Sequence, residues 1–474
     1  MNKEQLSDAI GQVNDELVTK TAPPHRKRRW WRMAVAAAAC LAVAAGAVLI
    51  PRAPAAGLPG GVNRLATAVY PPELTEPQRT EDGSYVDEAA GEQWSELCWN
   101  NDRQAARLSG TLDAYEKTIV RQLLSDRRGE NRVVSPLNLY MTLGMLAECT
   151  AGDSRAQILR LTGADSVEQL RRRTGALWLA EYRDSSTGVC RLANSLWLQK
   201  GLQYAQNTVN RLAQAHYASV FSGEMGSAAY DRALQDWLDE QTGGLLGEAV
   251  RHIETQQQTT VALASTVYFQ AKWREPFLKE DTRDGFFHGA GGDVACRYMT
   301  KTDAAGRVYL GQGFRAASLG FGSDHCSMWF VLPDEGSSVE ELLESGAWLE
   351  PSRAQELTSC ILSWRVPPLD VSSERELSRD LQALGVSDVF SGERADFSPL
   401  LTGDDSFISQ MNHAARVTVD EEGCTAAAFT VVDLAGAGMP NETLRIDLHL
   451  ERPFLFYITG DTGSVLFCGV VEQP

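Results

Sequence analysis

The sequence predicts an α+β fold for the region from about residue 94 to residue 474, and two observations support that prediction. Helical periodicity comes first along this region, and strand-like apolar runs dominate its carboxyl-terminal part. The two patterns do not alternate in the regular βαβα rhythm of a doubly wound sheet. We therefore expect helices and strands to be segregated in one large mixed domain.

Length and charge limit the alternatives. The chain has 474 residues, of which 43% are hydrophobic, so it is neither disordered nor fibrous. At about 150 residues per domain the length suggests roughly three domains, although one large mixed fold is also compatible with it. The net charge of −18 argues against a nucleic-acid partner, because such binding requires a basic surface that neutralises phosphates.

The amino-terminal region contains a candidate membrane anchor. Residues 33–50 carry no charge, and at about 1.5 Å per residue they span roughly 27 Å, which just suffices for a bilayer core. Five basic residues lie between positions 26 and 32, so the positive-inside rule places residues 1–32 in the cytoplasm. The sequence therefore predicts a single-pass protein of the cell membrane, with everything after the anchor outside.

A cleaved signal peptide is the alternative to an anchor. Residues 53–55 (Ala-Pro-Ala) are small enough for a cleavage site, and the protein would then be secreted. However, thirty-two residues precede the apolar run, and the run is longer than the 7 to 15 residues typical of a signal peptide. These two features favour the uncleaved anchor.

Residues 51–92 are expected to form a linker between the anchor and the large domain. Six prolines, several glycines and almost no apolar periodicity are typical of a semi-extended spacer. The large domain is therefore predicted at residues 93–474.

Within that domain, local patterns predict two helices and three strands. Apolar residues at Ile119, Val120, Leu123 and Leu124 favour a helix over 113–124, and a second helix over 138–148 follows Pro136. Strands are expected at 260–269, 327–332 and 453–459.

The nine cysteines are scattered, with no CxxC pair and no spacing typical of metal ligands. Neither a metal site nor a dense disulfide framework is expected, and buried free thiols are the favoured interpretation. One or two disulfides remain compatible with the sequence. We expect no cofactor.

Several motifs, in order along the chain, resemble those of the serpin family. They are NRVVSPLNLYMTLGMLAECTAGDSRAQILRLTG at 131–163, ANSLW at 193–197, HAARVTVDEEGCTAAAF at 413–429, and RPFLF at 452–456 with LFCG at 466–469. The resemblance covers about residues 100–474. It implies helices packed around a large central β-sheet, two smaller sheets and an exposed reactive loop.

The resemblance also implies a function, that of a suicide inhibitor of proteases. The target cleaves the exposed loop, the loop inserts as a new strand into the central sheet, and the acylated protease is carried along. The expected partner is a serine or cysteine protease, and the inhibitor is expected to be a monomer. We find no G-x-S-x-G, H-E-x-x-H or P-loop motif in the sequence, so we do not expect an enzyme.

The resemblance places the reactive-loop hinge in the acidic and alanine-rich segment 421–428. Its residues are Glu421, Glu422, Gly423, Cys424, Thr425, Ala426, Ala427 and Ala428. Side chains alternate along a strand, so Cys424, Ala426 and Ala428 would share one uniformly small face that fits a packed interior. The two glutamates are expected to keep the hinge solvated. Cys424 stands where the family usually has Thr or Ser, and its exposed thiol would add redox sensitivity.

The family's spacing places the reactive bond between Ala437 and Gly438, fourteen residues beyond the hinge glycine. The loop is about five residues longer than usual, so bonds from 435–436 to 438–439 remain candidates. The surrounding small apolar residues suit a protease with a shallow apolar pocket, of elastase or subtilisin type. A trypsin-like target is not expected, because no Lys or Arg lies between Arg416 and Arg445.

The resemblance also identifies a gate at which the strands of the central sheet must part. Its positions are Ser135, Asn138, Ser265 and His413. Ser265 replaces the asparagine common in the family, which is expected to weaken the hydrogen-bond network. Together with Cys424 and Thr425, this difference leaves open an alternative function, a non-inhibitory binding module at the cell surface.

Overall fold

The computed structural model describes residues 61–70, 77, 80, 84–108, 110–126, 129–184, 188–244, 247–322, 326–403, 406–409, 411–424 and 444–473. These residues belong to one compact unit, which spans 58–474. The predicted cytoplasmic stub, the predicted anchor, the later hinge residues and the reactive bond all lie outside the described residues.

Helices make up most of the first part of the domain, as predicted. The helices are α3 Glu88–Leu108, α4 Asp113–Leu124, α5 Pro136–Cys149, α6 Gly152–Thr162, α7 Val167–Glu181, α8 Gln206–Ala215, α9 Ala228–Gln241, α10 Gly247–Val250, α11 Val339–Ser345 and α12 Ser378–Ala383. Short 3₁₀ turns follow at η1 Lys279–Asp281, η2 Ala347–Ser352 and η3 Asp388–Phe390. The predicted helices at 113–124 and 138–148 are confirmed as α4 and α5.

Helix α5 is buried along its whole length. It begins where the Ser135 hydroxyl accepts a hydrogen bond from the Asn138 N–H, with Pro136 in the first turn, where its missing N–H costs nothing. This start positions two of the gate residues at the end of a rigid element.

The first sheet has the strand order β1-β5-β4-β6-β14, with β3 paired to β4. Its strands are β1 Asn63–Ala66, β5 Ala218–Gly223, β4 Gly188–Gln199, β6 Val261–Lys272, β14 Gly423–Cys424 and β3 Arg183–Asp184. Strand β6 confirms the strand predicted at 260–269.

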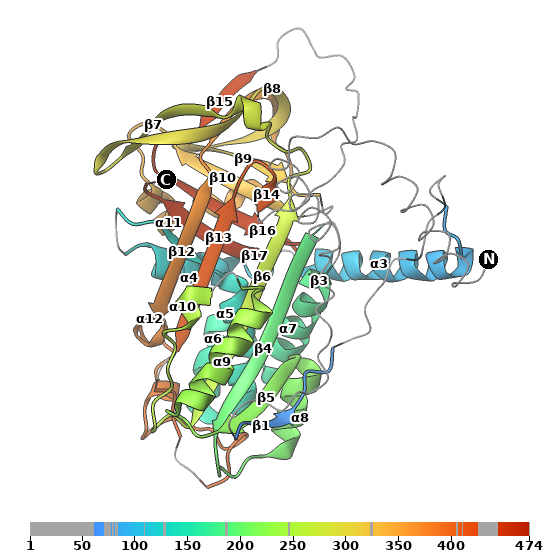
Figure 1. Cartoon of the computed structure of the whole chain (residues 1–474), viewed down its shortest axis with the longest axis vertical. Helices are drawn as coiled ribbons and strands as arrows, with labels where there is room; N and C mark the ends of the chain where they lie inside the picture. The colour runs from blue at the N-terminus through green and yellow to red at the C-terminus, as the bar shows by residue number, and fades with distance from the viewer. Residues whose placement is uncertain are drawn as a thin grey trace, which may run out of the picture. The chain divides into compact units, whose positions relative to one another are not determined.

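A separate two-stranded sheet consists of β12 Leu369–Glu376 and β13 Asn412–Val419. Figure 1 shows these strands running alongside β6 and β4, with α5 and α7 behind. Among the described residues, no backbone pairing joins β6 to β13. The predicted central sheet is therefore present in two parts, which face each other across an unpaired boundary.

The remaining strands form a nine-stranded sheet in the order β15-β11-β8-β9-β10-β16-β17-β2, with β7 paired to β8. Its strands are β15 Arg445–His449, β11 Thr358–Val366, β8 Gly292–Gly311, β9 Phe314–Gly320, β10 Ser327–Pro333, β16 Phe454–Thr459, β17 Val465–Val471, β2 Arg132–Val134 and β7 Arg283–Gly289. Strands β10 and β16 confirm two further predictions. The late strand β17 pairs with the early strand β2 and is buried throughout.

The predicted linker boundary is wrong in part, because pieces of 51–92 belong to the folded unit. Strand β1 pairs with β5 at the edge of the first sheet, and α3 begins at Glu88. The run 63–70 is too short for its periodicity to stand out, and its partner lies about 150 residues further along the chain. No helix among the described residues is long and apolar enough to cross a bilayer, and the predicted span at 33–50 lies outside that set.

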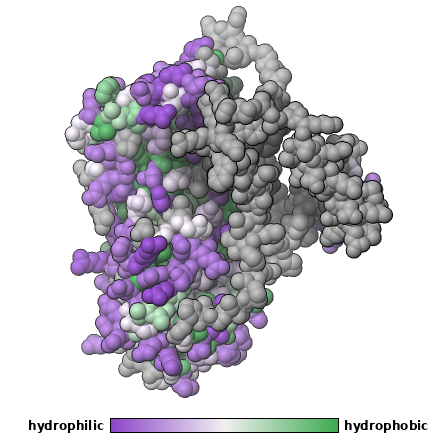
Figure 2. Space-filling model, in the orientation of Figure 1, coloured by the Kyte–Doolittle hydropathy of each residue, from purple (hydrophilic) through white to green (hydrophobic). Residues whose placement is uncertain are grey.

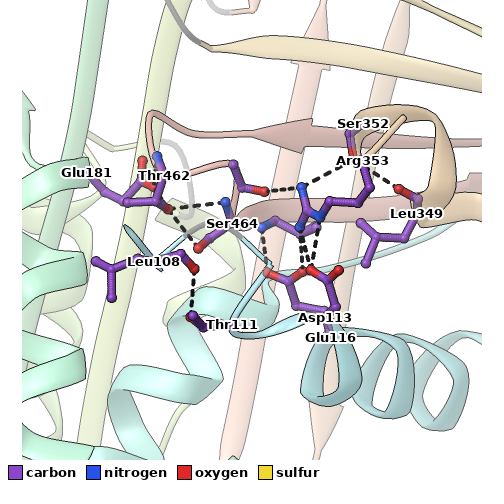
Figure 3. Close-up of polar contacts among 12 residues, drawn as sticks. Leu108, Thr111, Asp113, Glu116, Glu181, Leu349, Ser352, Arg353, Thr462 and Ser464 are labelled. Atoms are coloured by element: carbon purple, nitrogen blue, oxygen red, sulfur yellow. Dashed lines mark hydrogen bonds and ion pairs between the residues drawn. The ribbon is translucent and has the colours of Figure 1, made fainter. Parts of the chain in front are cut away.

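Two buried carboxylates hold the turn between β16 and β17 (Figure 3). Glu181 of α7 accepts hydrogen bonds from the backbone N–H groups of Asp461 and Thr462, both at 2.9 Å. Glu116 of α4 accepts from the Val465 N–H at 2.8 Å. Burial raises the pKa of each carboxyl to about 7. Hydrophilic residues dominate the coloured part of the face seen in Figure 2, whereas these two acids lie inside the domain.

Candidate functional site

The structure brings the four gate residues together from α5, β6 and β13. The Ser135 N–H donates to His413 Nε2 at 3.1 Å, and Asn138 Nδ2 donates to the Ser265 carbonyl oxygen at 2.7 Å. Helix α5 is therefore hydrogen-bonded to a strand on each side of the unpaired boundary. A separation of β6 from β13 would occur directly over this helix.

His413 is buried, and burial lowers its pKa to about 4. Because Nε2 accepts the hydrogen bond from Ser135, the imidazole is neutral, with its proton on Nδ1. The gate thus holds no charge from this residue at neutral pH.

Ser265 contributes its backbone carbonyl to the gate rather than its side chain. The replacement of the family's asparagine was expected to weaken the hydrogen-bond network. The bond from Asn138 is nevertheless present, since any residue at position 265 supplies this acceptor.

The hinge begins with a tight turn at Asp420. One carboxylate oxygen of Asp420 accepts from the N–H groups of Glu422 at 2.9 Å and Gly423 at 3.1 Å. Asp420 was not among the predicted hinge residues, although an Asp shortly before a glycine is a known signal for such turns. The turn directs the chain from the end of β13 back towards β6.

The two hinge glutamates are fastened to the segment after β6. The Phe277 and Trp273 N–H groups donate to the backbone oxygens of Glu421 and Glu422, at 2.9 and 3.0 Å. The Glu421 carboxylate accepts from the Thr282 hydroxyl at 2.9 Å, and the Glu422 carboxylate lies 3.1 Å from Lys279 Nζ. Both side chains are partly exposed, so the hinge is polar as expected, but it is also anchored.

Gly423 and Cys424 form strand β14, which pairs antiparallel with Lys272 and Ala271 of β6. A Cβ atom on Gly423 would lie 2.4 Å from the Ala271 carbonyl oxygen. Only glycine permits the two backbones to approach so closely. The loop thus starts as a strand at one end of the unpaired edge of β6.

The prediction of an exposed Cys424 thiol is wrong. The residue is 3% exposed, and burial raises the pKa of its thiol to about 12. The first residue of the small face already packs inside the sheet through its pairing with Ala271. A protonated, buried thiol is a poor nucleophile, so the structure gives no basis for the redox sensitivity expected at this position.

The other described cysteines agree with the prediction of free thiols. No disulfide among the described residues involves Cys149, Cys190, Cys296, Cys326, Cys360, Cys424 or Cys468. No group of side chains able to hold a metal ion occurs in the described part of the chain.

Four of the hinge residues and the reactive bond are not placed. Thr425, Ala426, Ala427, Ala428, Ala437 and Gly438 lie outside the described residues. The next described residue is Leu444, immediately before β15.

A domain in which a loop begins as a strand at the boundary of a divided central sheet has the architecture of a loop-inserting inhibitor. The family model described as "Serpin (serine protease inhibitor)" matches residues 114–474, and the chain belongs to the serpin family. Serpins are inhibitors of proteases and not catalytic enzymes, which agrees with the missing hydrolase motifs.

Similar proteins include named inhibitors. Human leukocyte elastase inhibitor is 27% identical over 386 residues, which cover 78% of this chain and 100% of that protein. Plasminogen activator inhibitor 1 of Neovison vison is 26% identical over 377 residues, covering 75% and 90%.

Solved structures share the fold. Arabidopsis AtSerpin1, in its native stressed conformation, has a TM-score of 0.67 and 25% identity, with 77% of this chain and 98% of that chain covered. The thermophilic serpin tengpin in its native state has a TM-score of 0.68 at 22% identity, covering 77% and 93%.

Proposed function

We propose that the protein inhibits elastase-like or subtilisin-like serine proteases outside the cell by loop cleavage and strand insertion. The observation that supports this most directly is the start of the loop. Gly423 and Cys424 are already paired with β6, and the facing edges of β6 and β13 are unpaired among the described residues. A continuing strand would have a place to enter.

The register of β14 predicts which side chains would enter the sheet. If the pairing continues, Ala426 and Ala428 follow Cys424 onto the buried face, and Thr425 and Ala427 lie on the opposite face. Alanine at both buried positions lets the strand slide in without displacing the packing beneath it.

The residues that catalyse cleavage of the reactive bond are those of the target protease. Its serine Oγ attacks the carbonyl carbon of Ala437, the bond to the Gly438 nitrogen breaks, and the nitrogen leaves as an amine after taking a proton from the target's histidine. The ester that remains joins Ala437 to the protease. Insertion of residues 425–437 would then carry this acyl-enzyme away from the geometry needed for hydrolysis.

The test uses the full chain with pancreatic elastase and with subtilisin. We expect a complex that survives SDS, and mass spectrometry of the released peptide should place the cut between residues 435 and 439. Ala426→Arg, on the buried face, should turn the inhibitor into a substrate that is cut without forming a complex. The matched variant Ala427→Arg should still form it.

A non-inhibitory binding module is the second candidate, favoured by Cys424 and Thr425 at positions where the family usually has other residues. Cleavage of the wild-type loop without complex formation and without a rise in the unfolding temperature would support this candidate and refute inhibition. A cut outside 435–439 would refute the assignment of the reactive bond.

We also propose the membrane topology predicted by the sequence. Residues 1–32 are cytoplasmic, 33–50 span the membrane, and the domain is outside as a monomer. The charge-free run and the five basic residues before it support this arrangement. Resistance to alkaline carbonate extraction, with the domain digestible on intact cells, would agree with it. A mature chain that begins after residue 50 would instead indicate a cleaved signal and a secreted protein.

A further inference from the structure

Residues 61–70, which we name the strap, run from the edge of the first sheet to the helices behind it. At one end, β1 pairs with β5, with Arg64 opposite Phe221. At the other end, the Val69 N–H donates to the carbonyl oxygen of Ala213 in α8 at 2.9 Å. The strap therefore contacts two layers of the domain.

The sheet end of the strap has contacts beyond backbone pairing. The Arg64 guanidinium lies over the Phe221 ring, 5.5 Å from its centroid. The Ala68 N–H donates to the Ser219 hydroxyl at 3.2 Å. The cation–π contact adds a modest attraction between the strap and β5.

The helix end is an aromatic stack. The Tyr70 ring lies 5.3 Å from the ring of Trp178 in α7, at an angle of 12°. It also lies 6.1 Å from Tyr182 and 6.3 Å from Tyr217. Trp178 is only 2% exposed and forms a hydrogen bond to the Leu192 carbonyl oxygen of β4.

The same stack holds a strained residue between α8 and β5. Tyr217 has φ = 50°, the left-handed region that non-glycine residues seldom adopt. This conformation is unfavourable for an L-residue, and the centroid of the Tyr217 ring lies 4.1 Å from that of Trp178. Packing around the ring, to which Tyr70 contributes, maintains that conformation.

The position of the strap matters because the first sheet must move as a unit when a strand enters. A new strand lies about 4.8 Å from each of its neighbours, so β6 and β13 must stand about two strand spacings apart to admit it. Strands β4 and β5 are paired in series with β6, so they shift with it. The strap joins β5 at the outer end of this unit to α7 and α8.

We propose that the strap restrains strand insertion, so that releasing its aromatic end from the helices accelerates entry of a strand between β6 and β13. The inference deepens the proposed function and rests on it, since it concerns the same insertion step. It assigns a regulatory role to a segment that the sequence presents as linker.

The test measures insertion without a protease. A fluorescently labelled peptide with the sequence of residues 424–436 is incubated with the full chain, and its uptake is followed over time. Tyr70→Ala removes the ring that stacks on Trp178, and we expect uptake about tenfold faster, since an aromatic pair and its buried area are lost. Val69→Ala alters an exposed side chain of the same segment and should leave the rate unchanged.

Two further variants test whether faster uptake could come from a general loss of folding. Tyr70→Phe keeps the ring and should restore the wild-type rate, and Arg64→Ala at the sheet end should accelerate uptake two- to threefold. Equal rates for wild type and Tyr70→Ala, or equal acceleration by Val69→Ala, would overturn the proposal. If the protein takes up the peptide but never traps a protease, inhibition would be refuted, whereas the proposal that the strap restrains strand insertion would still hold. No uptake in any variant would overturn both.

Discussion

Gly423 occupies a position that no other residue can take without moving the backbone around it. The atoms nearest to an added Cβ are the Ala271 oxygen, Lys272 Cα and the Trp273 nitrogen, and all three belong to the main chain. A side chain could swing aside, but these atoms cannot. The loop can therefore start here only because residue 423 has no Cβ atom.

We expect Gly423→Ala to lower the free energy of unfolding by about 1–3 kcal/mol, the usual cost of overpacking a dense site. Denaturant unfolding of the full chain measures it. Gly175→Ala in α7 is the matched control, because its Cβ would lie at an ordinary 3.5 Å from the Ala215 oxygen. A loss of equal size in both variants would contradict the steric argument.

The residue scale also shows where sequence reasoning succeeds and fails at the site. The motif placed Ser135, Asn138, Ser265 and His413 together because each position is tied to a recognisable neighbourhood. It failed for Cys424, because burial there depends on a pairing with Ala271 about 150 residues earlier. The exposed fraction of a side chain depends on the segments that pack against it as well as on its own neighbours in the sequence.

Elements with strong local patterns were predictable, and those defined by distant partners were not. Helix α4 has its own apolar period, and strands β6, β10 and β16 coincide with local strand-like runs. The strap does not, since a short run between prolines becomes a strand only beside β5. The division of the central sheet could not be predicted either, because no local sequence pattern indicates that two strands do not pair.

The turn between β16 and β17 is held by hydrogen bonds to buried side chains. The Thr462 hydroxyl donates to Glu181 and accepts from the Ser464 N–H at 3.1 Å. Thr462→Val leaves the buried carboxylate with one donor fewer, so we expect a loss of about 1–3 kcal/mol in unfolding free energy. Thr402→Val removes an exposed hydroxyl and should change little. Equal losses in both variants would show that the buried network contributes nothing special.

At the scale of the whole molecule, buried acids predict a dependence of stability on pH. Glu116 and Glu181 have a folded pKa of about 7 against 4.5 when unfolded, so the folded protein binds more protons between these values. Their contribution is fully present below pH 4.5 and is lost as pH rises through 7. Stability should therefore increase by about 1 kcal/mol per carboxyl when pH falls from 8 to 6.

His413 acts in the opposite direction at lower pH. Its pKa falls from 6.5 to about 4 on folding, so its contribution is present above pH 6.5 and is lost as pH falls through 4. Two carboxyls outweigh one histidine, so chemical unfolding at several pH values should show that these three groups together give the greatest stability at about pH 4. Glu181→Gln should flatten the slope between pH 6 and 8, whereas the exposed Glu335→Gln should not. An unchanged slope in Glu181→Gln would show that Glu181 does not contribute to the dependence of stability on pH.

The pairing of β2 with β17 has a consequence for how the protein is made. More than 300 residues separate the two strands, and at about 5–20 residues per second the ribosome needs on the order of half a minute to add them. During that interval the early strand β2 lacks the strand with which it pairs. An unpaired strand edge can pair with another chain, so we expect mutations that slow translation between residues 134 and 465 to reduce yield without altering the finished molecule.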